Sequence, residues 1–334
     1  MTVQVLDGDA ALWALAAEWE VLWQRLPGRT PFTAPAWLLP WWRHFGTGQP
    51  RVATLRQGGQ LVAVLPLYVL DEPGCRKLLP IGAGLSDYQD ILAAPGLDPS
   101  SLLHAVLARA DGVDVCDLIQ VPPGSLLRTA SAPPGWAMAW GDGSPCPVLA
   151  LPASVEGLPD VVPARTLRKL RMNRNRAERG GGIARERATE ATLPRLQAEL
   201  IRLHQARWTR QGEAGVLADP RVLGLHREAA PDLLRAGVLR LEALFVGGEV
   251  VAAIMALLEG PGRILFYLSG FDEAHAFISP GTLLLGAMLE DAIREGRREA
   301  DFLQGREDYK YAWGAVDRPN GFCRLTPTMQ GQRL

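Results

Sequence analysis

The order of apolar segments in the second half of the chain most constrains its fold. Three consecutive runs, VLRLEALFV, EVVAAIMALLE and RILFYLSGF, read as a three-stranded meander, with a Gly247-Gly248 turn between the first two. A helix from Pro280 to about Glu295 follows, then the strand ADFLQ, a short helix through REDYKYAWG and a last strand around GFCRLTP. This order predicts an α+β fold with a central mixed β-sheet flanked by helices.

The first half of the chain shows a looser version of the same order. A helix that ends near Leu26 and a second, aromatic helix at about 35–45 precede the hairpin RVATLRQGGQLVAVLPLYVL and further short strands. With 334 residues, the chain also exceeds the usual size of one domain, roughly 100–200 residues. We therefore predict two tandem halves of related architecture, an N-terminal half at 1–152 and a C-terminal half at 153–334.

Composition and charge argue against several classes of protein. A hydrophobic fraction of 48% and a charged fraction of 21% are typical of globular proteins. The formal net charge of -1 provides no overall attraction to nucleic acid or anionic membrane, and no run approaches the ~18 apolar residues of a spanning helix. Four separated cysteines without a C-x-x-C pair and five scattered histidines predict no metal site, and reduced thiols are expected in a cytoplasmic protein.

The start of the last long helix is a candidate anion site. Ser279 is the expected N-cap, Pro280 stands at the first helical position, and Gly281 follows. The unpaired N–H groups of a helix start attract anions, and a glycine there lets a ligand approach the backbone. We predict that Ile278, Ser279, Gly281 and Thr282 bind the pyrophosphate of a cofactor; a helix that is merely well capped is the alternative.

Ionisable side chains gather where the next strand ends, in the stretch DFLQGREDYK. Loops after strand ends often carry function, because the sheet positions them while they stay accessible. Tyr309 is predicted to donate a proton to a leaving thiolate, and Asp301 is predicted to be a second catalytic residue. The alternatives are a tyrosine bonded only to backbone and a solvated helix face. The residues predicted to contact substrate are Gln304, Arg306, Glu307 and Lys310.

Positive charge is concentrated in residues 163–187, which hold nine Lys and Arg against two Glu. On a helix, Arg168, Arg171, Asn175 and Arg179 share one face. We predict that Arg168 and Arg171 hold a phosphate-bearing substrate such as a nucleotide sugar, a lipid-linked saccharide or a tRNA end. A solvated helix balanced by acidic neighbours is the alternative.

A second charged loop, SDYQD, lies in the first half of the chain. A carboxylate there could accept a proton from the attacking ammonium, so Asp87 is predicted to be catalytic and Tyr88 and Asp90 to bind substrate. A loop that bonds only its own backbone is the alternative. Because ligand sites favour domain interfaces, we expect this loop and the Asp301–Lys310 loop to line one cleft between the halves.

Four stretches carry a resemblance to a known family. ISPGTLLLGAMLEDAIREG and DFLQGREDYKYAW, with LHQARW at 203–208 and GLSDYQDILAAPG at 84–96, are similar to the CelD-type GNAT acyltransferases. That branch is found beside bacterial polysaccharide-synthesis genes and is related to the FemABX peptidyltransferases. The resemblance covers roughly residues 30–325. It implies tandem GNAT-like halves, an acyl-CoA pyrophosphate at residues 278–282, and direct attack of an amine on the thioester.

Three functions remain open on the sequence alone. The first is an acyl-CoA-dependent N-acyltransferase acting on a small-molecule or saccharide amine, such as an amino sugar or cell-envelope precursor, without metal, nucleic acid or membrane insertion. The second is an aminoacyl-tRNA-dependent transferase of the FemABX kind, favoured by the two halves and the cationic segment. The third is a non-catalytic binding protein on a GNAT-like frame, because AHAFISPGT has one glycine where the usual pyrophosphate signature has Gly-x-Gly or Gly-x-Ala.

Overall fold

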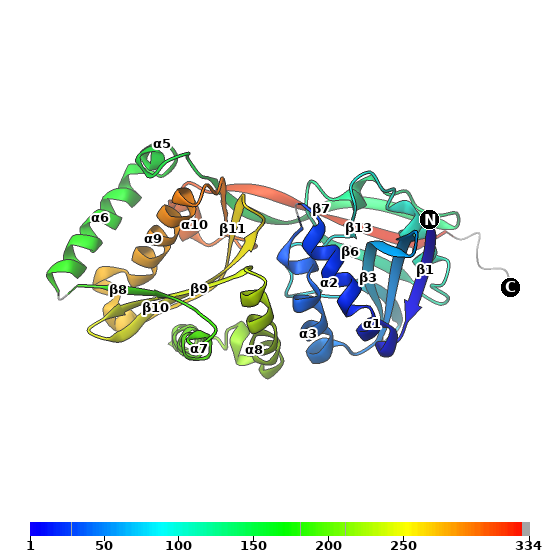
Figure 1. Cartoon of the computed structure of the whole chain (residues 1–334), viewed down its shortest axis with the longest axis horizontal. Coiled ribbons are helices and arrows are strands. Elements are labelled where there is room, and N and C mark those ends of the chain that lie inside the picture. Colours follow the sequence, from blue (N-terminus) through cyan, green and yellow to red (C-terminus); the bar gives the residue numbers. More distant parts are fainter. Residues whose placement is uncertain (28, 181, 211, 329–334) are drawn as a thin grey trace. The chain divides into compact units, whose positions relative to one another are not determined.

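The computed structural model describes residues 1–334 except 28, 181, 211 and 329–334 (Figure 1). The chain forms two compact units. Unit 1 comprises Met1–Pro145 and the segment that begins at Pro319, and unit 2 comprises Cys146–Arg318. These units differ from the halves 1–152 and 153–334 because the chain returns to unit 1, where its last strand pairs with a strand of that unit.

Unit 1 is a mixed sheet with flanking helices. Its strands are β1 (Thr2–Asp7), β2 (Gln49–Gln57), β3 (Gln60–Glu72), β4 (Cys75–Pro80), β5 (Leu92–Ala93), β6 (Val115–Val121), most of β7 (Trp136–Ala150) and most of β13 (Val316–Pro327). Hydrogen bonding orders them as β1-β2-β3-β4-β6-β13, with β5 on β3. The helical elements are α1 (Asp9–Ala14), α2 (Ala16–Arg25), η1 (Pro31–Thr33), α3 (Pro35–Phe45), α4 (Ser100–Leu107) and η2 (Leu126–Thr129).

Aromatic residues fill the core beneath the helices of unit 1. Trp19 and Trp37 are fully buried, and their indole N–H groups donate to the Thr33 carbonyl (3.1 Å) and the Ser86 hydroxyl (3.0 Å). A buried indole needs such an acceptor, because leaving its N–H unpaired away from water costs free energy. Trp19 and Trp37 therefore fill the core of unit 1 with their indole N–H groups bonded.

The strands of unit 2 are also of mixed direction and pair in the order β7-β12-β11-β10-β9-β8. Its further strands are β8 (Ala184–Arg187), β9 (Leu239–Val246), β10 (Glu249–Glu259), β11 (Arg263–Phe271) and β12 (Glu299–Asp301). The helical elements are η3 (Val155–Gly157), α5 (Leu158–Val161), α6 (Ala164–Arg179), α7 (Leu193–Arg210), η4 (Val216–Ala218), α8 (Pro220–Arg235), η5 (Glu273–Ile278), α9 (Pro280–Arg294) and α10 (Asp308–Ala312). Figure 1 shows α6 and α9 on one side of this sheet and α7 and α8 on the other.

The predicted meander is confirmed in unit 2, where β9, β10 and β11 pair antiparallel in sequence, and α9, β12, α10 and β13 follow it along the chain as predicted. The apolar face of α9 packs on this sheet through residues such as Leu284, Met288 and Leu289. Both β7 and β13 are longer than PCPVLALP and GFCRLTP suggested, whereas YQDILAA forms only the two-residue β5. Among the described helices, none is long and apolar enough to cross a membrane.

Candidate functional site

Strands β11 and β12 form a fork in the sheet of unit 2. They pair in parallel only from Arg263–Glu299 to Leu265–Asp301. Beyond Leu265, β11 stays paired with β10 as far as Phe271, whereas β12 ends. One edge of β11 therefore has no partner strand within the described chain from Phe266 onward. Such an edge offers backbone donors and acceptors to the amides of a ligand.

The fork opens into a pocket of 340 Å³. This volume lies in the lower part of the range for ligand sites, roughly 300–1,000 Å³. Aromatic and aliphatic side chains form most of the wall, and hydroxyls, glycines and two cations are placed among them. The lining comes from β11 (266–271), the start of α9 (279–282), Phe302, Tyr309 and Trp313 beyond β12, Arg207 of α7 and Lys169 of α6.

A β-bulge bends β11 at this pocket. Met255 of β10 lies opposite Leu268 and Ala256 lies opposite Phe266, so Tyr267 is the extra residue. A bulge adds twist and re-aims the side chains around it, and bulges are frequent beside active sites. The consecutive residues 266–271 all line the pocket, where the free edge of β11 and the bulge lie together.

The start of α9 presents two unpaired backbone donors to the pocket. Ser279 occupies the N-cap position with φ 50° and ψ 65°, and its side chain makes no cap hydrogen bond, contrary to our expectation. Its N–H donates to Ala276 (3.0 Å), and its carbonyl accepts from Leu283 (3.1 Å). Within the described chain, the N–H groups of Gly281 and Thr282 have no acceptor, and both residues line the pocket.

Two of the four residues predicted to bind pyrophosphate thus offer backbone N–H groups, and a third, Ser279, lines the pocket with its N–H already bonded. The fourth, Ile278, is 1% exposed and belongs to the apolar core, so it anchors the turn and does not line the pocket. A Cβ at Gly281 would lie 3.4 Å from the Phe271 ring, so any larger side chain would press on the pocket wall.

Tyr309 lies in the pocket wall with its ring edge-on to Phe302, at 6.2 Å between ring centroids. Its hydroxyl has no hydrogen-bond partner among the residues described, whereas the Tyr311 hydroxyl donates to Asp317 (2.7 Å). Loss of solvation in the pocket raises the pKa of Tyr309 to about 12, even though the residue is 42% exposed; the negative charge of Glu307 adds to this, while Arg207 opposes it. Tyr309 is therefore a protonated, unpaired donor beside the fork.

Arg207 is a pocket residue that sequence reasoning missed, although it belongs to the stretch LHQARW. Its guanidinium lies 5.1 Å from the Phe271 ring centre and 5.8 Å from that of Trp208. Within the described part of the chain it has no carboxylate partner. A Cβ at Gly270 would lie 2.5 Å from the backbone N of His204, so only glycine lets α7 approach β11 closely here. That close approach brings Arg207, one turn further along α7, to the pocket.

Asp301, predicted to be catalytic, lies outside the pocket. Its side chain is fully buried, forms an ion pair with Arg263 and accepts the backbone N–H of Leu303 at 2.8 Å. A buried carboxylate must be neutralised in this way, since an unpaired charge in the core is costly. This placement argues against a catalytic role and assigns Asp301 to the structure of the fork.

Lys310 and Glu307 also organise the protein instead of facing the pocket. The Lys310 ammonium is buried and donates to the carbonyls of Leu303 (3.2 Å), Gln304 (2.6 Å) and Gly305 (3.3 Å). The Glu307 carboxylate lies 2.9 Å from the same nitrogen. The ammonium therefore holds the loop between β12 and α10, which positions Tyr309.

The other two predicted substrate contacts of this loop do not line the pocket either. The Arg306 side chain is 71% exposed and pairs with Asp317 at 3.2 Å. Gln304 is half-buried, and its backbone carbonyl is an acceptor for Lys310. The structure therefore does not support a substrate contact in this pocket for either residue.

The predicted residues of the first half lie in unit 1. Tyr88 is 1% exposed and packs near Phe32, so it is a core residue. The Asp90 carboxylate accepts the Ser125 hydroxyl and its neighbour's N–H, and the Asp87 carbonyl accepts from Asn320 at 3.1 Å. Since Asp87 and Tyr309 belong to different units, their meeting in one cleft stays a prediction.

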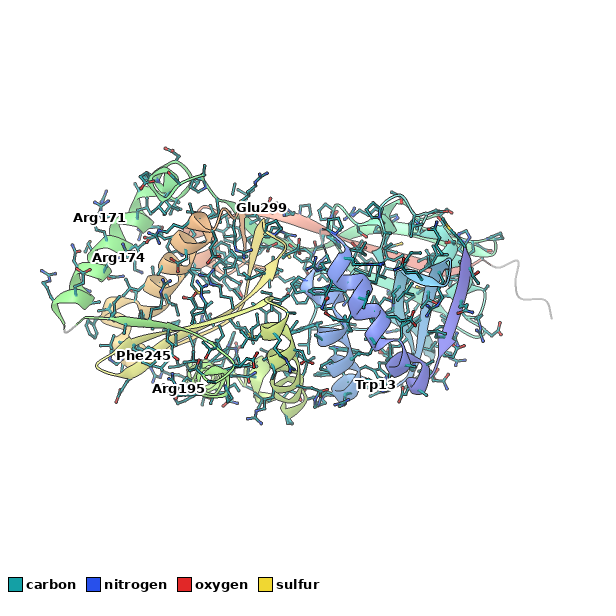
Figure 2. All side chains as sticks on the ribbon, viewed as in Figure 1. Trp13, Arg171, Arg174, Arg195, Phe245 and Glu299 are labelled. Carbon is teal, nitrogen blue, oxygen red and sulfur yellow. The ribbon has the colours of Figure 1, made fainter. Side chains whose placement is uncertain are left out.

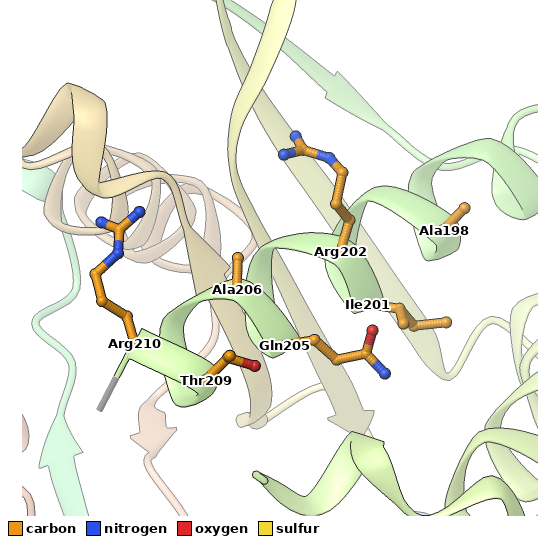
Figure 3. Close-up of a pocket in the computed structure, with 7 residues that line it drawn as sticks. All are labelled: Ala198, Ile201, Arg202, Gln205, Ala206, Thr209 and Arg210. Atoms are coloured by element: carbon orange, nitrogen blue, oxygen red, sulfur yellow. The ribbon is translucent and has the colours of Figure 1, made fainter. Parts of the chain in front are cut away.

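Arg168 and Arg171 are exposed on α6, without carboxylate partners in the described chain, and Figure 2 labels Arg171. Their neighbour Lys169 lines the pocket, and they do not. A separate hollow lies on one face of α7, lined by Ala198, Ile201, Arg202, Gln205, Ala206, Thr209 and Arg210 (Figure 3). All seven come from one helix, so this hollow lacks the convergent groups of a catalytic site. The described residues hold no group of three His, Cys, Asp or Glu arranged for a metal.

Comparisons with known proteins agree with this geometry. Residues 164–311, which lie within unit 2, match the family described as the acetyltransferase (GNAT) domain. No curated protein matches the sequence. The structure is similar to that of FemX, with a TM-score of 0.66 and 11% identity over 97% of each chain.

A second similar structure is the C-terminal domain of a putative lysylphosphatidylglycerol synthetase from Agrobacterium fabrum. The TM-score is 0.58 at 12% identity, over 94% of this chain and 92% of that one. A conserved protein of unknown function from Bacteroides thetaiotaomicron gives 0.60 at 12% identity, over 97% and 100%. At such low identity these likenesses concern the fold alone. The predicted fold class, a mixed β-sheet flanked by helices, is confirmed in both units, and unit 2 carries the match to the GNAT acetyltransferase domain.

Proposed function

We propose that the chain is an N-acyltransferase that moves an acyl group from acyl-CoA to an amine. The observation that carries this proposal is the pocket at the fork of β11 and β12. It combines the unpaired N–H groups of Gly281 and Thr282, an unpaired strand edge, apolar walls and the Tyr309 hydroxyl. These features suit, in turn, the pyrophosphate, the amides, the acyl chain and the thioester sulfur of one acyl-CoA molecule.

The proposed reaction is a direct transfer in a ternary complex. The neutral amine attacks the thioester carbonyl, a C–N bond forms, and the C–S bond breaks. The leaving thiolate takes a proton from Tyr309, and the attacking nitrogen loses one proton to solvent. Tyr309 then regains its proton from solvent, so protons balance and no covalent enzyme intermediate is needed.

The pKa of Tyr309 keeps its hydroxyl protonated at neutral pH, so the proton is available when negative charge develops on the leaving sulfur. At about 12, this pKa exceeds that of a free thiol in water, about 8.5. Burial in the pocket also raises the pKa of the thiol, because the thiolate loses solvation there, and this favours proton transfer from Tyr309. Arg207, whose charge lowers the pKa of Tyr309, favours negative charge at this end of the pocket.

The acceptor is proposed from the family resemblance. CelD-type proteins act in the setting of polysaccharide synthesis, so we propose the amine of an amino sugar or of a cell-envelope precursor. Three of the four stretches that carry the resemblance, DFLQGREDYKYAW above all, contribute residues to the wall or the supporting loop of the pocket, whereas GLSDYQDILAAPG lies in unit 1. An assay with a panel of amino sugars, following release of free thiol, tests this choice.

Ligand binding is the direct test of the donor. We expect CoA, acetyl-CoA and longer acyl-CoAs to raise the melting temperature, because a ligand that binds only the native state adds about 2.7 kcal/mol at a hundredfold excess over its Kd. Isothermal titration with the same ligands measures the affinity. If no CoA species binds while an aminoacyl-tRNA supports transfer, the donor is of the FemABX kind and the acyl-CoA proposal is wrong.

A further inference from the structure

The exposed face of α6 carries cations that the protein itself does not neutralise. The helix turns Leu170, Asn173 and Ala177 inward. Arg165, Arg168, Lys169 and Arg171 are exposed and have no ion pair within the described residues. Other cations of the same segment are paired: Arg174 with Glu290 at 2.8 Å, and Arg185 with Asp291 at 2.6 Å. The segment therefore contains two groups of cations: those in ion pairs with α9, and those that face solvent without an ion pair in the described chain.

An exposed methionine lies in the middle of these cations. Met172 is 54% exposed, and helical spacing puts Arg168 one turn before it and Arg176 one turn after it. Arg176 donates to the backbone carbonyl of Phe277, whose side chain is 57% exposed. Two exposed large apolar side chains of the described chain thus lie on the elements that Arg176 joins, α6 and η5, on a cationic surface.

A helix face that only contacts water would explain the exposed arginines. It would not explain why the apolar side chains of Met172 and Phe277 are exposed beside them. Nucleic acid would satisfy the charges, but its phosphate backbone gives Met172 and Phe277 nothing to bury into. An anionic bilayer satisfies both, because cations bind the headgroups while apolar side chains enter the boundary of the acyl chains. Single exposed apolar residues are common. Met172 and Phe277 differ from them in lying among cations that have no ion pair in the described chain.

We propose that this α6 surface, formed by Arg165, Arg168, Lys169, Arg171, Met172 and Phe277, docks the protein on an anionic lipid bilayer. Figure 2 shows Arg171 on this helix. Lys169 also lines the pocket, and Phe277 lies between Ala276 and Ser279, which line it too. Docking therefore presents the pocket to the membrane surface, whichever reaction the pocket performs.

The experiment is co-flotation of the full-length protein with vesicles. We expect binding to vesicles of phosphatidylcholine and phosphatidylglycerol in equal amounts, weakened by added salt, and none to phosphatidylcholine alone. Each arginine near such a surface contributes about fivefold in partitioning. The double variant Arg168→Glu, Arg171→Glu should therefore bind roughly 25-fold less, or weaker still because reversal adds repulsion. The double variant Met172→Gln, Phe277→Gln keeps every charge and should also bind severalfold less.

The matched control is Arg227→Glu with Arg298→Glu, two exposed arginines that have no ion pair among the described residues and lie outside the α6 surface. It changes the net charge by the same amount and should bind vesicles like the unmodified protein. Melting temperatures of all variants should be equal, since every substituted side chain is exposed. Equal loss in the control and the α6 variants would overturn the proposal. So would binding of RNA oligonucleotides through the same arginines without any binding of anionic vesicles.

Discussion

The same parallel strand pair occurs in both units and has opposite consequences. In unit 1, β4 pairs with β6 in parallel at Lys77–Val115 and Leu78–Cys116. The space beside that pair is only 10 Å³, because side chains such as Phe32, Leu38 and Leu127 fill it. Beside the β11–β12 pair of unit 2, the space is 340 Å³. A fork in a sheet thus becomes a binding site only where neighbouring elements leave it open.

Two further features are satisfied or buried in unit 1 and open in unit 2: the start of a helix and a tyrosine side chain. In unit 1, the first N–H of α4 donates to the Asp98 carboxylate at 2.9 Å, so the protein supplies its own anion. At the start of α9, Gly281 and Thr282 find no such acceptor in the described chain. Tyr88 of unit 1 is 1% exposed, whereas Tyr309 is 42% exposed. Unit 1 therefore satisfies these groups with its own side chains, whereas unit 2 leaves them beside an open pocket.

The largest expected difference between the units is their response to acid. His204 and His226 of unit 2 are buried, and burial lowers the pKa of each from 6.5 to about 4, with Arg207 adding to the effect at His204. A lowered folded pKa gives stability that is complete above 6.5 and is lost as the pH falls toward 4. Each histidine should therefore cost about 2 kcal/mol of unfolding free energy by roughly pH 5.

Hydrogen exchange read by mass spectrometry tests this, since it reports the two units separately. Between neutral pH and about pH 5, peptides of unit 2 should lose protection before those of unit 1, whose histidines His44 and His104 are not buried. The double variant His204→Gln, His226→Gln should flatten the dependence. Earlier loss of protection in unit 1 would contradict the prediction.

The next effect concerns Lys310. Lys310→Met keeps most of the buried stem but leaves three carbonyls without their donor. Since unsatisfied buried acceptors each cost of order 1 kcal/mol, we expect about 3 kcal/mol of lost stability in chemical denaturation. The exposed Arg306, substituted by Met, is the control and should change stability little. A variant with unchanged stability and a raised KM would instead restore Lys310 as a substrate contact.

Tyr309→Phe should lower turnover by roughly 10²-fold, because it removes the proposed proton donor and keeps the ring that packs on Phe302. The unpaired hydroxyl predicts little change in melting temperature. Tyr88→Phe is the matched control in unit 1: it should lower stability by ~1 kcal/mol and leave the rate per folded molecule unchanged. A normal rate for folded Tyr309→Phe would remove Tyr309 from the mechanism.

The smallest effect is expected on donor affinity. Gly281→Val would press on Phe271 and obstruct the two free N–H groups. The loss of one charge-assisted hydrogen bond, about 1.5 kcal/mol, corresponds to roughly tenfold weaker binding in calorimetry. Asp98→Ala removes the cap of α4 in unit 1 and should cost ~1 kcal/mol of stability without changing donor affinity. Unchanged affinity in folded Gly281→Val would count against the donor site.

Local patterns in the sequence determined the order of elements. The meander of β9, β10 and β11 follows from apolar runs separated by turn residues, and the start of α9 follows from Pro280 at the first helical position. Hydrophobic periodicity and turn chemistry are properties of neighbouring residues, so they can be read without knowing the fold. The places of Gly281 and Thr282 at a helix start, and of Tyr309 shortly after a strand, could be predicted in the same way. Their meeting in one pocket depends on the parallel pairing of β11 and β12.

Only the tertiary structure decided which polar side chains face the pocket. Asp301, Tyr309 and Lys310 are equally plausible site residues in the sequence, because all three follow or end the same strand. In the structure Asp301 is held by an ion pair, and Lys310 by backbone carbonyls, so neither faces the pocket. Arg207 reaches the pocket because Gly270 lets α7 approach β11 closely. Burial and partner choice depend on residues distant in the chain, and the free energy of burying a charge is set by those partners. A single sequence lists the chemical groups, and long-range packing decides which of them remain available to a ligand.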